Sequence, residues 1–280
     1  MPLPDISVII VSWNVKDLLY QCLVSLMRQT GVTAEIFVVD NASTDGTPAM
    51  VGQSFPRARL IVNDKNVGFA KANNQALNLA AGRYLLLLNP DTELRPDSLK
   101  QVVDFMEKHP RAAIAGCRLL NTDGTLQPSV RRFPTLVSQA WILLKAHHLL
   151  PTAKYWASNF NYHQAQEVDQ VMGAFFMIRR EAFAELGMLD ENFFIWFEEV
   201  DYCRRAKNCG WQVWYAPVTE VTHHGGQSFN QLMSFTKQRM FNRSMLYYFK
   251  KHHRRSSWLI LWLLSPASLA LAWLYSWRVR

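Results

Sequence analysis

Short apolar runs alternate with helical patterns through the first hundred residues of this 280-residue chain. Four runs have the length and composition of strands: residues 6–11, 35–39, 60–62 and 84–88. Between them, residues 16–28 and 68–81 repeat apolar side chains at helical spacing. The strands are continuously apolar, as parallel strands covered on both faces usually are. The order therefore predicts βαβ units and an α/β fold with a mainly parallel sheet.

The pattern changes after residue 100. The sequence predicts helices at residues 96–109 and 180–186, and strands at residues 112–120, 171–179 and 213–215. Residues 120–135 are rich in turn formers. The chain contains no internal repeat. We therefore expect one domain over residues 1–230, divided into halves at residues 1–100 and 101–230.

Polar side chains follow three of the predicted strands, where each strand ends. They are Ser12 and Asn14, Asp40 and Asn41, and Asn89 and Asp91. A further polar segment carries Asn66, Gly68 and Asn74. Because the carboxyl ends of parallel strands meet at one edge of a sheet, these groups are expected to converge on one ligand. Taken singly, each cluster also fits an ordinary turn or helix cap.

Asp91 has a setting that suits a divalent cation. It follows a buried strand and stands directly after Pro90, which fixes the turn. Hard cations such as Mg²⁺ take oxygen ligands and usually share them with substrate phosphates. The competing interpretation of Asp91 alone is a turn or helix-capping aspartate.

Three acids lie close together in an aromatic segment. Glu198, Glu199 and Asp201 follow Trp196 and Phe197. Repulsion and lost solvation are expected to raise the pKa of at least one of these carboxyls towards that of a useful base. An equal alternative is a helix N-terminus whose acids complement the macrodipole.

The net positive charge of the protein comes from the end of the chain. The net charge is +8, but residues 237–280 hold nine Lys and Arg and no acid. The rest of the chain is therefore nearly neutral, and nucleic acid is not an expected partner. The basic cluster precedes an uncharged stretch at residues 256–277.

This end of the chain predicts membrane attachment. About 20 apolar residues span a bilayer, and aromatic residues flank the stretch as in an interfacial belt. Pro266 near its centre leaves a re-entrant or interfacial helix as an alternative to a span. A buried core helix is a third alternative. We expect residues 231–255 to form a basic amphipathic helix and residues 256–280 to form the attachment segment.

Seven motifs together resemble family-2 glycosyltransferases of the GT-A fold, and most of all the bacterial rhamnosyltransferase-like members. In chain order they are SVIIVSWN, EIFVVDNASTDGT, NVGFAKANNQAL, YLLLLNPDTEL, GAFFMIRREAFAELGMLDENFF, FEEVDYCRR and HHGGQS. The resemblance covers roughly residues 5–230. It implies a Rossmann-like mixed sheet and inverting transfer of a sugar from a nucleotide-diphosphate donor, dTDP-rhamnose or a UDP-sugar, in cell-surface polysaccharide synthesis.

The resemblance also implies roles for individual residues. Asp40 matches the position that binds the pyrimidine base, and Asp91 the metal-binding acid of the DxD motif, in which Asn89 replaces the first acid. His223 matches a late histidine that completes Mg²⁺ or Mn²⁺ binding. Glu199 matches the catalytic base and is one methylene longer than the usual aspartate.

Some of these roles have alternatives. Glu198 and Asp201 are the reserves for the base, and Trp196 and Phe197 are expected to form a platform for the acceptor or sugar. The expected acceptor is a glycan or polyprenyl-linked hydroxyl at the cytoplasmic face of the plasma membrane. The oligomeric state, including a homo-oligomer, is left open. A non-catalytic nucleotide-sugar-binding subunit is the competing function, whereas a dinucleotide-binding oxidoreductase lacks support because no GxGxxG follows the first strand.

Overall fold

The protein is built around a mixed sheet of ten strands. The computed structural model describes residues 3–146, 155, 157, 159–225 and 234–278. Eight strands form the path β3-β2-β1-β4-β11-β6-β12-β5, β7 and β9 add to β6 and β12, and β8 pairs with β10 in a separate two-stranded sheet. The strands are β1 (Ile6–Ser12), β2 (Ala34–Asp40), β3 (Arg59–Val62), β4 (Tyr84–Leu88), β5 (Thr92–Leu94), β6 (Ala112–Leu120), β7 (Leu126–Gln127), β8 (Val130–Arg131), β9 (Gln166–Glu167), β10 (Gln170–Val171), β11 (Phe175–Arg179) and β12 (Gln212–His223).

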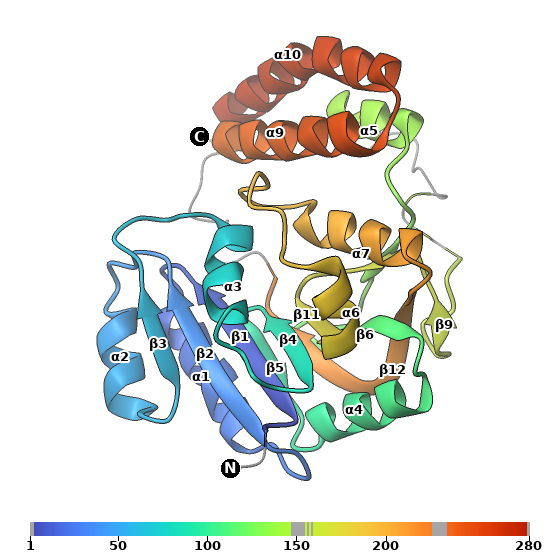
Figure 1. The fold of residues 1–280 in the computed structure, drawn as a ribbon. Helices are drawn as coiled ribbons and strands as arrows, with labels where there is room; N and C mark the ends of the chain where they lie inside the picture. The colour runs from blue at the N-terminus through green and yellow to red at the C-terminus, as the bar shows by residue number, and fades with distance from the viewer. Residues whose placement is uncertain (1–2, 147–154, 156, 158, 226–233, 279–280) are drawn as a thin grey trace.

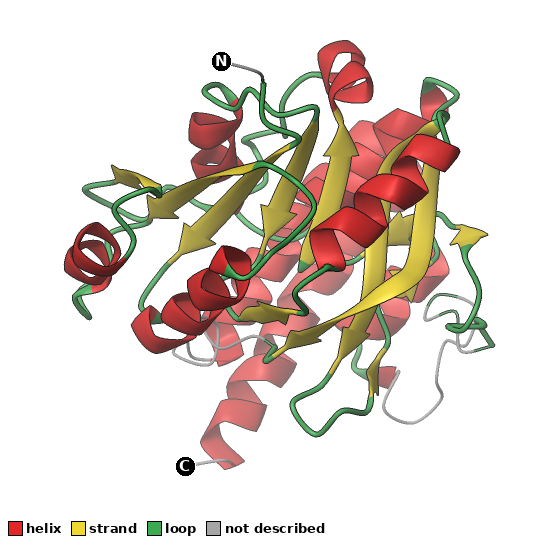
Figure 2. Ribbon diagram, turned by 90° about the horizontal axis from the view of Figure 1, so that it is seen from below, coloured by secondary structure: helices red, strands yellow, loops and turns green. Residues whose placement is uncertain are grey.

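Helices cover both faces of this sheet (Figure 2). The helices of the described residues are α1 (Lys16–Met27), α2 (Thr47–Ser54), α3 (Phe69–Leu77), α4 (Ser98–Lys108), α5 (Leu136–Leu143), α6 (Arg180–Leu186), α7 (Glu198–Asn208), α9 (Ser234–His252) and α10 (Arg255–Arg278). Alternate residues of β1, β2 and β4 enter two core clusters, one shared with α1, α2 and α4 and the other with α3, α6 and α7. Both faces of these strands are therefore buried, which explains why their sequences are continuously apolar.

The first half of the chain forms the predicted parallel sheet. β3, β2, β1 and β4 run parallel, and Ser12 lies opposite Asp40 in the register of β1 and β2. β11 is antiparallel to β4 and places Phe175 beside Leu88. The start of β11 therefore lies at the same edge as the ends of β1, β2 and β4.

Four predicted elements differ from the structure. The strand expected at residues 171–179 is split into β10 and β11, and the short strand at residues 213–215 is the beginning of the much longer β12. The helix predicted at residues 68–81 ends at Leu77. A strand, β5, intervenes between Asp91 and α4, where a helix start was expected directly. β5 forms because it pairs with the far end of β12, which is a long-range contact.

The turn-rich excursion at residues 120–135 contains short strands that the sequence did not predict. β7 and β8 have two residues each, and each depends on a partner strand, β6 for β7 and β10 for β8. Helix α5 follows them and begins with a capping box at Thr135 and Ser138.

The C-terminal helices form a third layer with α5. In Figure 1, α10 lies along α9, and α5 lies beside them, above the sheet domain. Leu261 and Phe249 are buried in the cluster that joins these helices, and the Asn242 side chain donates to the Ser265 carbonyl at 3.3 Å. α10 is thus packed lengthwise against α9. The predicted boundary at residues 230–231 lies outside the described residues.

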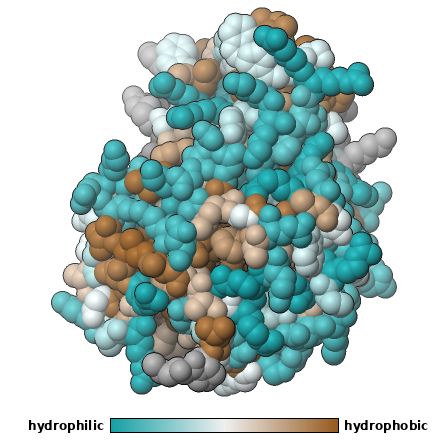
Figure 3. Space-filling view, viewed as in Figure 1, coloured by the Kyte–Doolittle hydropathy of each residue, from teal (hydrophilic) through white to brown (hydrophobic). Residues whose placement is uncertain are grey.

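One face of α10 stays exposed and apolar. Trp262, Leu263 and Leu274 are each more than half exposed. In the view of Figure 3, side chains of high, intermediate and low hydropathy are mixed at this end of the molecule. Among the described residues, residues 255–274 are the one stretch of helix long and apolar enough to cross a membrane, and little of it is buried.

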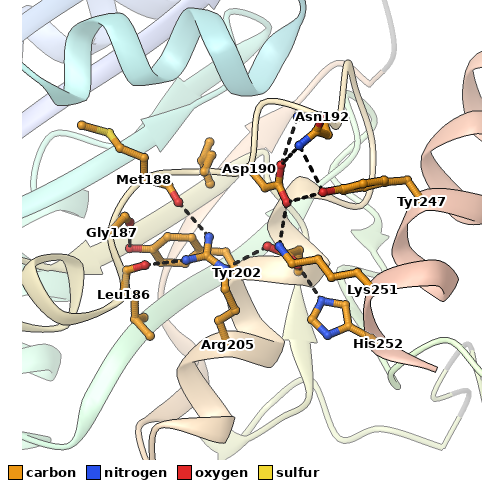
Figure 4. Close-up of polar contacts among 12 residues, drawn as sticks. Leu186, Gly187, Met188, Asp190, Asn192, Tyr202, Arg205, Tyr247, Lys251 and His252 are labelled. Atoms are coloured by element: carbon orange, nitrogen blue, oxygen red, sulfur yellow. Dashed lines mark hydrogen bonds and ion pairs between the residues drawn. The ribbon is translucent and has the colours of Figure 1, made fainter. Parts of the chain in front are cut away.

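A polar network fixes α9 to the sheet domain (Figure 4). Lys251 lies 2.7 Å from a carboxylate oxygen of Asp190 and 2.8 Å from one of Asp201. His252 Nε2 lies 2.6 Å from the same Asp201 oxygen, and Arg205 donates to the other at 2.9 Å. Asp201 is fully buried, so this network joins α9 to α7 from inside the protein.

Candidate active site

A cavity of about 440 Å³ opens at the carboxyl edge of the parallel strands. Both halves of the chain and α9 contribute to it. Its lining contains Val11, Trp13, Asn41, Asn66, Gly68, Phe69, Asn89, Pro90, Asp91, Arg131, Met172, Gly173, Ala174, Phe194, Ile195, Trp196, Glu198, Glu199, His223 and Met240. Nine predicted site residues are therefore brought together: Asn41, Asn66, Gly68, Asn89, Asp91, Trp196, Glu198, Glu199 and His223.

Asn41 organises the loop on one wall of the cavity. Its amide nitrogen donates to Asn66 Oδ1 and to the Gly68 carbonyl, each at 3.2 Å. Its amide oxygen accepts from the Asn63 side chain at 3.0 Å and from the Val67 backbone at 3.3 Å. Buried polar groups of this kind require such partners, so Asn41 holds residues 63–68 in one conformation.

Gly68 allows the two halves of the chain to meet. It has φ +90°, and a Cβ atom there would lie 2.6 Å from the Phe194 carbonyl oxygen. That oxygen accepts from the Phe69 backbone at 2.6 Å. Glycine is needed both for the dihedral angle and for the close approach.

Asp91 and His223 meet because β5 pairs with β12, in which His223 lies opposite Thr92. Asp91 Oδ1 is 3.3 Å from His223 Nε2, and both side chains are buried. Gln127 Oε1 lies 2.7 Å from Nδ1 of the histidine, which favours a proton on Nδ1 and a lone pair on Nε2. Asn89 Nδ2 lies 3.2 Å from that Nε2 atom.

This arrangement fits a divalent cation. Two ligands at right angles on Mg²⁺ lie about 3.0 Å apart, close to the separation of Asp91 Oδ1 and His223 Nε2. Gln127 would orient the imidazole as an outer hydrogen-bond partner of a metal-bound histidine does. No group of three or more His, Cys, Asp or Glu suited to a metal occurs in the described part of the chain. The remaining ligands would therefore come from substrate phosphates and water.

Glu198 and Glu199 begin α7 and line the same cavity. Burial raises the pKa of Glu198 well above its usual value, and the neighbouring charge of Glu199 raises it further. Burial also raises the pKa of Glu199, but backbone hydrogen bonding and the charge of Arg131 oppose this effect. One carboxylate oxygen of each residue is buried without a hydrogen-bond partner. The pair is thus poised so that Glu198 holds a proton more firmly than Glu199.

Trp196 and Phe197 have left-handed backbone conformations, with φ +60° and +71°. Trp196 lines the cavity, whereas Phe197 is buried and packs against Phe241 and Tyr248 of α9. Such strained conformations in non-glycine residues cluster at functional sites. Here they turn the chain sharply into α7 and direct Glu198 and Glu199 to the cavity.

Three predicted donor-site residues do not line the cavity. Asp40 is fully buried, with one carboxylate oxygen accepting from the Ser43 backbone at 2.9 Å and the other without a partner. The Ser12 hydroxyl is also buried without a partner. Asn14 Oδ1 accepts from the Thr44 backbone at 2.7 Å. The unpartnered oxygen of Asp40 suits a donor such as a base N–H.

Two other predicted residues have contacts elsewhere. The Asn74 amide binds the Leu189 backbone in both directions and donates to Glu191 at 3.1 Å, which ties α3 to the loop before α7. Asp201 binds Lys251 and the other cations of the α9 network. The proposed roles of these two residues in binding and catalysis stay predictions.

Three residues that shape the site, among others, were not predicted from the sequence. Gln127 and Arg131 lie on the two-residue strands β7 and β8, and Met240 lies on α9. Short strands have no sequence signal of their own. Met240 lies in the segment that was expected to form a basic amphipathic helix, so its contact with the cavity was not predicted.

Comparison with known proteins identifies the family. The model described as "Glycosyl transferase family 2" matches residues 7–187. An N-acetylglucosaminyl-diphospho-decaprenol L-rhamnosyltransferase of Mycobacterium tuberculosis is 30% identical over 243 residues, which cover 80% of this chain and 77% of that protein. The predicted rhamnosyltransferase-like resemblance is thereby confirmed.

Solved structures show the same fold. A mannosyltransferase from Pyrobaculum calidifontis, in complex with GDP-Man and Mn²⁺, has a TM-score of 0.60 at 16% identity and covers 97% of this chain and 74% of its own. GalNAc-T7 with UDP, GalNAc and Mn²⁺ has a TM-score of 0.59 at 19% identity over 79% of this chain, which spans 44% of that structure's chain. The predicted GT-A fold is confirmed, and the chain belongs to glycosyltransferase family 2.

Proposed function

We propose that this protein is a membrane-attached, metal-dependent inverting glycosyltransferase. It takes a sugar from a nucleoside-diphosphate donor, dTDP-rhamnose or a UDP-sugar, and transfers it to a hydroxyl of a lipid-linked glycan in cell-surface polysaccharide synthesis. The observation that carries this proposal is one cavity that holds both Asp91 with His223 and the Glu198–Glu199 pair. The names of the M. tuberculosis relative and of the nucleotide-sugar complexes support the substrate classes.

On the donor side, residues of the sheet edge bind and orient the nucleotide sugar. The unpartnered oxygen of Asp40 supports a hydrogen bond from the base. Asp91 and His223 would hold Mg²⁺ or Mn²⁺, which supplies positive charge to the departing nucleoside diphosphate. Asn89 removes one negative charge from this ligand set, so tight binding of the metal depends on the phosphates.

On the acceptor side, Glu199 is the proposed base. It accepts the proton of the acceptor hydroxyl as the hydroxyl oxygen bonds to the anomeric carbon and the bond from that carbon to the diphosphate oxygen breaks. Arg131 favours the ionised form of Glu199, while burial and repulsion favour a protonated Glu198. A single displacement inverts the anomeric carbon and requires only one base.

The helical layer supports attachment to one leaflet. Because α10 packs along α9, a spanning α10 would carry basic α9 residues such as Arg239, Arg243 and Lys250 towards the hydrocarbon, at a high cost. An α10 lying in the interface buries its exposed apolar face instead. The basic residues of α9 and of the turn before α10 suit anionic lipids of the cytoplasmic leaflet.

The activity is tested with purified full-length protein, Mn²⁺, a panel of UDP-, GDP- and dTDP-sugars, and a polyprenyl-diphosphate-linked acceptor. We expect release of nucleoside diphosphate together with a glycosylated lipid. Asp91→Ala and Glu199→Gln should each reduce transfer by about 10³-fold or more. Glu199→Gln should keep donor binding, measured as a donor-induced shift of melting temperature.

Two outcomes contradict the proposal. Full activity in both variants would show that Asp91 and Glu199 do not have the roles assigned to them. Donor binding without transfer to any acceptor would instead favour a nucleotide-sugar-binding subunit without catalysis. Lys65→Ala serves as a control because Lys65 is exposed and does not line the cavity.

A further inference from the structure

A second, larger cavity adjoins the candidate active site. Its volume is about 1030 Å³, and its lining includes Arg131, Arg132, Phe133, Val137 and Asp169. Arg131 lines both cavities, so the two spaces meet at this side chain. The second cavity therefore begins beside the carboxylates that face the acceptor.

The middle of this cavity carries two consecutive arginines. Arg131 belongs to β8 and is held in register by Gln170 of β10, and Arg132 follows and is exposed. The acids that line this cavity have partners of their own, since Glu167 lies 2.9 Å from Lys207 and Asp169 accepts from the Phe133 backbone at 3.1 Å. Arg131 itself interacts with Tyr155 and with the charge of Glu199. Arginine binds phosphate oxygens through two parallel N–H groups, so this pair suits a phosphate or diphosphate.

One wall of the cavity reaches the helical layer. Val137 of α5 lines it and is 71% exposed, and Leu144, on the same face of the helix, is 42% exposed. A neighbouring face of α5, with Leu136, Ala140 and Leu143, packs into the cluster shared with α9 and α10. The exposed apolar faces of α5 and α10 thus belong to one layer.

Polarity therefore changes from the first cavity to the second. The carboxylates line the first cavity, Arg131 lines both, and Arg132 and the apolar Val137 of α5 line the second. A sugar joined through phosphate to a long hydrocarbon has the same order of chemistry. The match is between three separate parts of the ligand and three separate parts of the surface.

We propose that the second cavity is the acceptor channel, in which Arg131 and Arg132 bind the phosphate or diphosphate that links the acceptor sugar to its lipid. The sugar hydroxyl then points to Glu199, and the hydrocarbon leaves over α5 into the leaflet that receives α10. This inference rests on the proposed function and adds to it the group by which the acceptor is recognised.

Arg132→Gln tests the channel, because Arg132 lines the second cavity and not the first. Two acceptors are compared: N-acetylglucosamine linked to a polyprenyl chain through diphosphate, and the octyl glycoside of the same sugar, which has no phosphate. We expect the KM of Arg132→Gln for the diphosphate acceptor to rise about tenfold, as loss of one charge-assisted hydrogen bond would cause. The KM for the octyl glycoside and for the nucleotide sugar should stay within about twofold.

Matched variants separate this effect from folding and from general charge. Arg132→Lys keeps the positive charge and should recover most of the affinity. Arg57→Gln removes an exposed arginine away from both cavities and should change no KM. Melting temperatures of all three variants check that the fold is intact.

The possible results divide clearly. An equal rise in KM for both acceptors, a rise in the donor KM, or no change at all would overturn the channel, and a donor effect would assign Arg132 to the nucleotide diphosphate. If the unmodified protein transfers sugar to no acceptor, the proposed function itself fails. If the protein transfers sugar and the Arg132 variants change no KM, the proposed acceptor channel is wrong but the proposed function stands.

Discussion

At the residue scale, Glu198 and Glu199 are adjacent in sequence but differ in surroundings. Both carboxyls have a raised pKa because they are buried, and only Glu199 is near enough to Arg131 for that charge to oppose the shift. A base acts when it is deprotonated, so activity should fall as the pH falls through the raised pKa of Glu199.

Glu198→Gln should therefore leave the acidic limb of the pH–rate profile in place. Neutral glutamine replaces a carboxyl that already holds its proton, so the pKa of Glu199 should change little, and the plateau of kcat should stay within about tenfold. The measurement is kcat against pH from 5 to 9 for the wild type and Glu198→Gln. Loss of activity in Glu198→Gln at every pH, together with an active Glu199→Gln, would make Glu198 the base.

Gly68 is a second residue whose backbone decides the site. Gly68→Ala adds strain at φ +90° and a clash with the Phe194 carbonyl, so we expect the free energy of unfolding to fall by about 3 kcal/mol, with a loss of kcat/KM because Phe194 lines the cavity. Gly210→Ala is the control, since Gly210 has φ +82° with nothing within 4 Å. Urea denaturation should show about 1 kcal/mol for this control. Equal losses in the two variants would mean that the close approach at Gly68 has no effect.

At the element scale, the contact between α7 and α9 depends on Asp201. Burial alone would raise the pKa of this carboxyl, but hydrogen bonds from His252 and Lys251 and the charge of Arg205 lower it overall. A native pKa below the usual 3.8 means that the stabilisation is present above that pH and is lost as the pH falls through the native value. The network therefore stabilises the protein at neutral pH and loses this contribution in strong acid.

Asp201→Asn should lower the free energy of unfolding by about 3 kcal/mol at pH 7, because it leaves the cations around it uncompensated. The difference from wild type should narrow only below pH 3.8, as the pH falls through the lowered native pKa and wild-type Asp201 becomes protonated. Urea denaturation at several pH values provides the measurement. Asp104→Asn, which removes an exposed partner of Lys100, should cost less than about 0.5 kcal/mol, and an equally small effect at position 201 would contradict the assigned role.

Sequence patterns predicted those elements that carry their own signal. β4 and the position of Asp91 after it were readable because the strand is buried on both faces and ends at a proline. β5, β7 and β8 were not readable, since each is two or three residues long and exists through its partner strand. Gln127 therefore could not be placed beside His223, although both residues were visible in the sequence.

At the scale of the whole molecule, the exposed face of α10 should determine membrane binding. Leu263→Glu with Leu274→Glu places two charges on that face, and vesicle affinity should fall by about tenfold or more, since each buried leucine contributes about 1.5–3 kcal/mol. Co-sedimentation with vesicles that contain anionic lipid measures the affinity. Transfer to a water-soluble acceptor should persist.

Leu79→Glu is the matched control, because Leu79 is about as exposed as these leucines but follows α3 on the sheet domain. Its vesicle affinity should equal that of the wild type. Undiminished binding of the α10 variant would show that α10 is not the attachment surface.

Met240 gives the C-terminal helices a second significance, because α9 supplies part of the cavity wall. A chimera in which an unrelated transmembrane anchor replaces everything after residue 230 would still reside in the bilayer but would have an incomplete catalytic chamber. Exchange of the same region between relatives would transplant substrate preference along with the anchor. The proposed membrane attachment and the shape of the catalytic cavity therefore depend on the same helical layer.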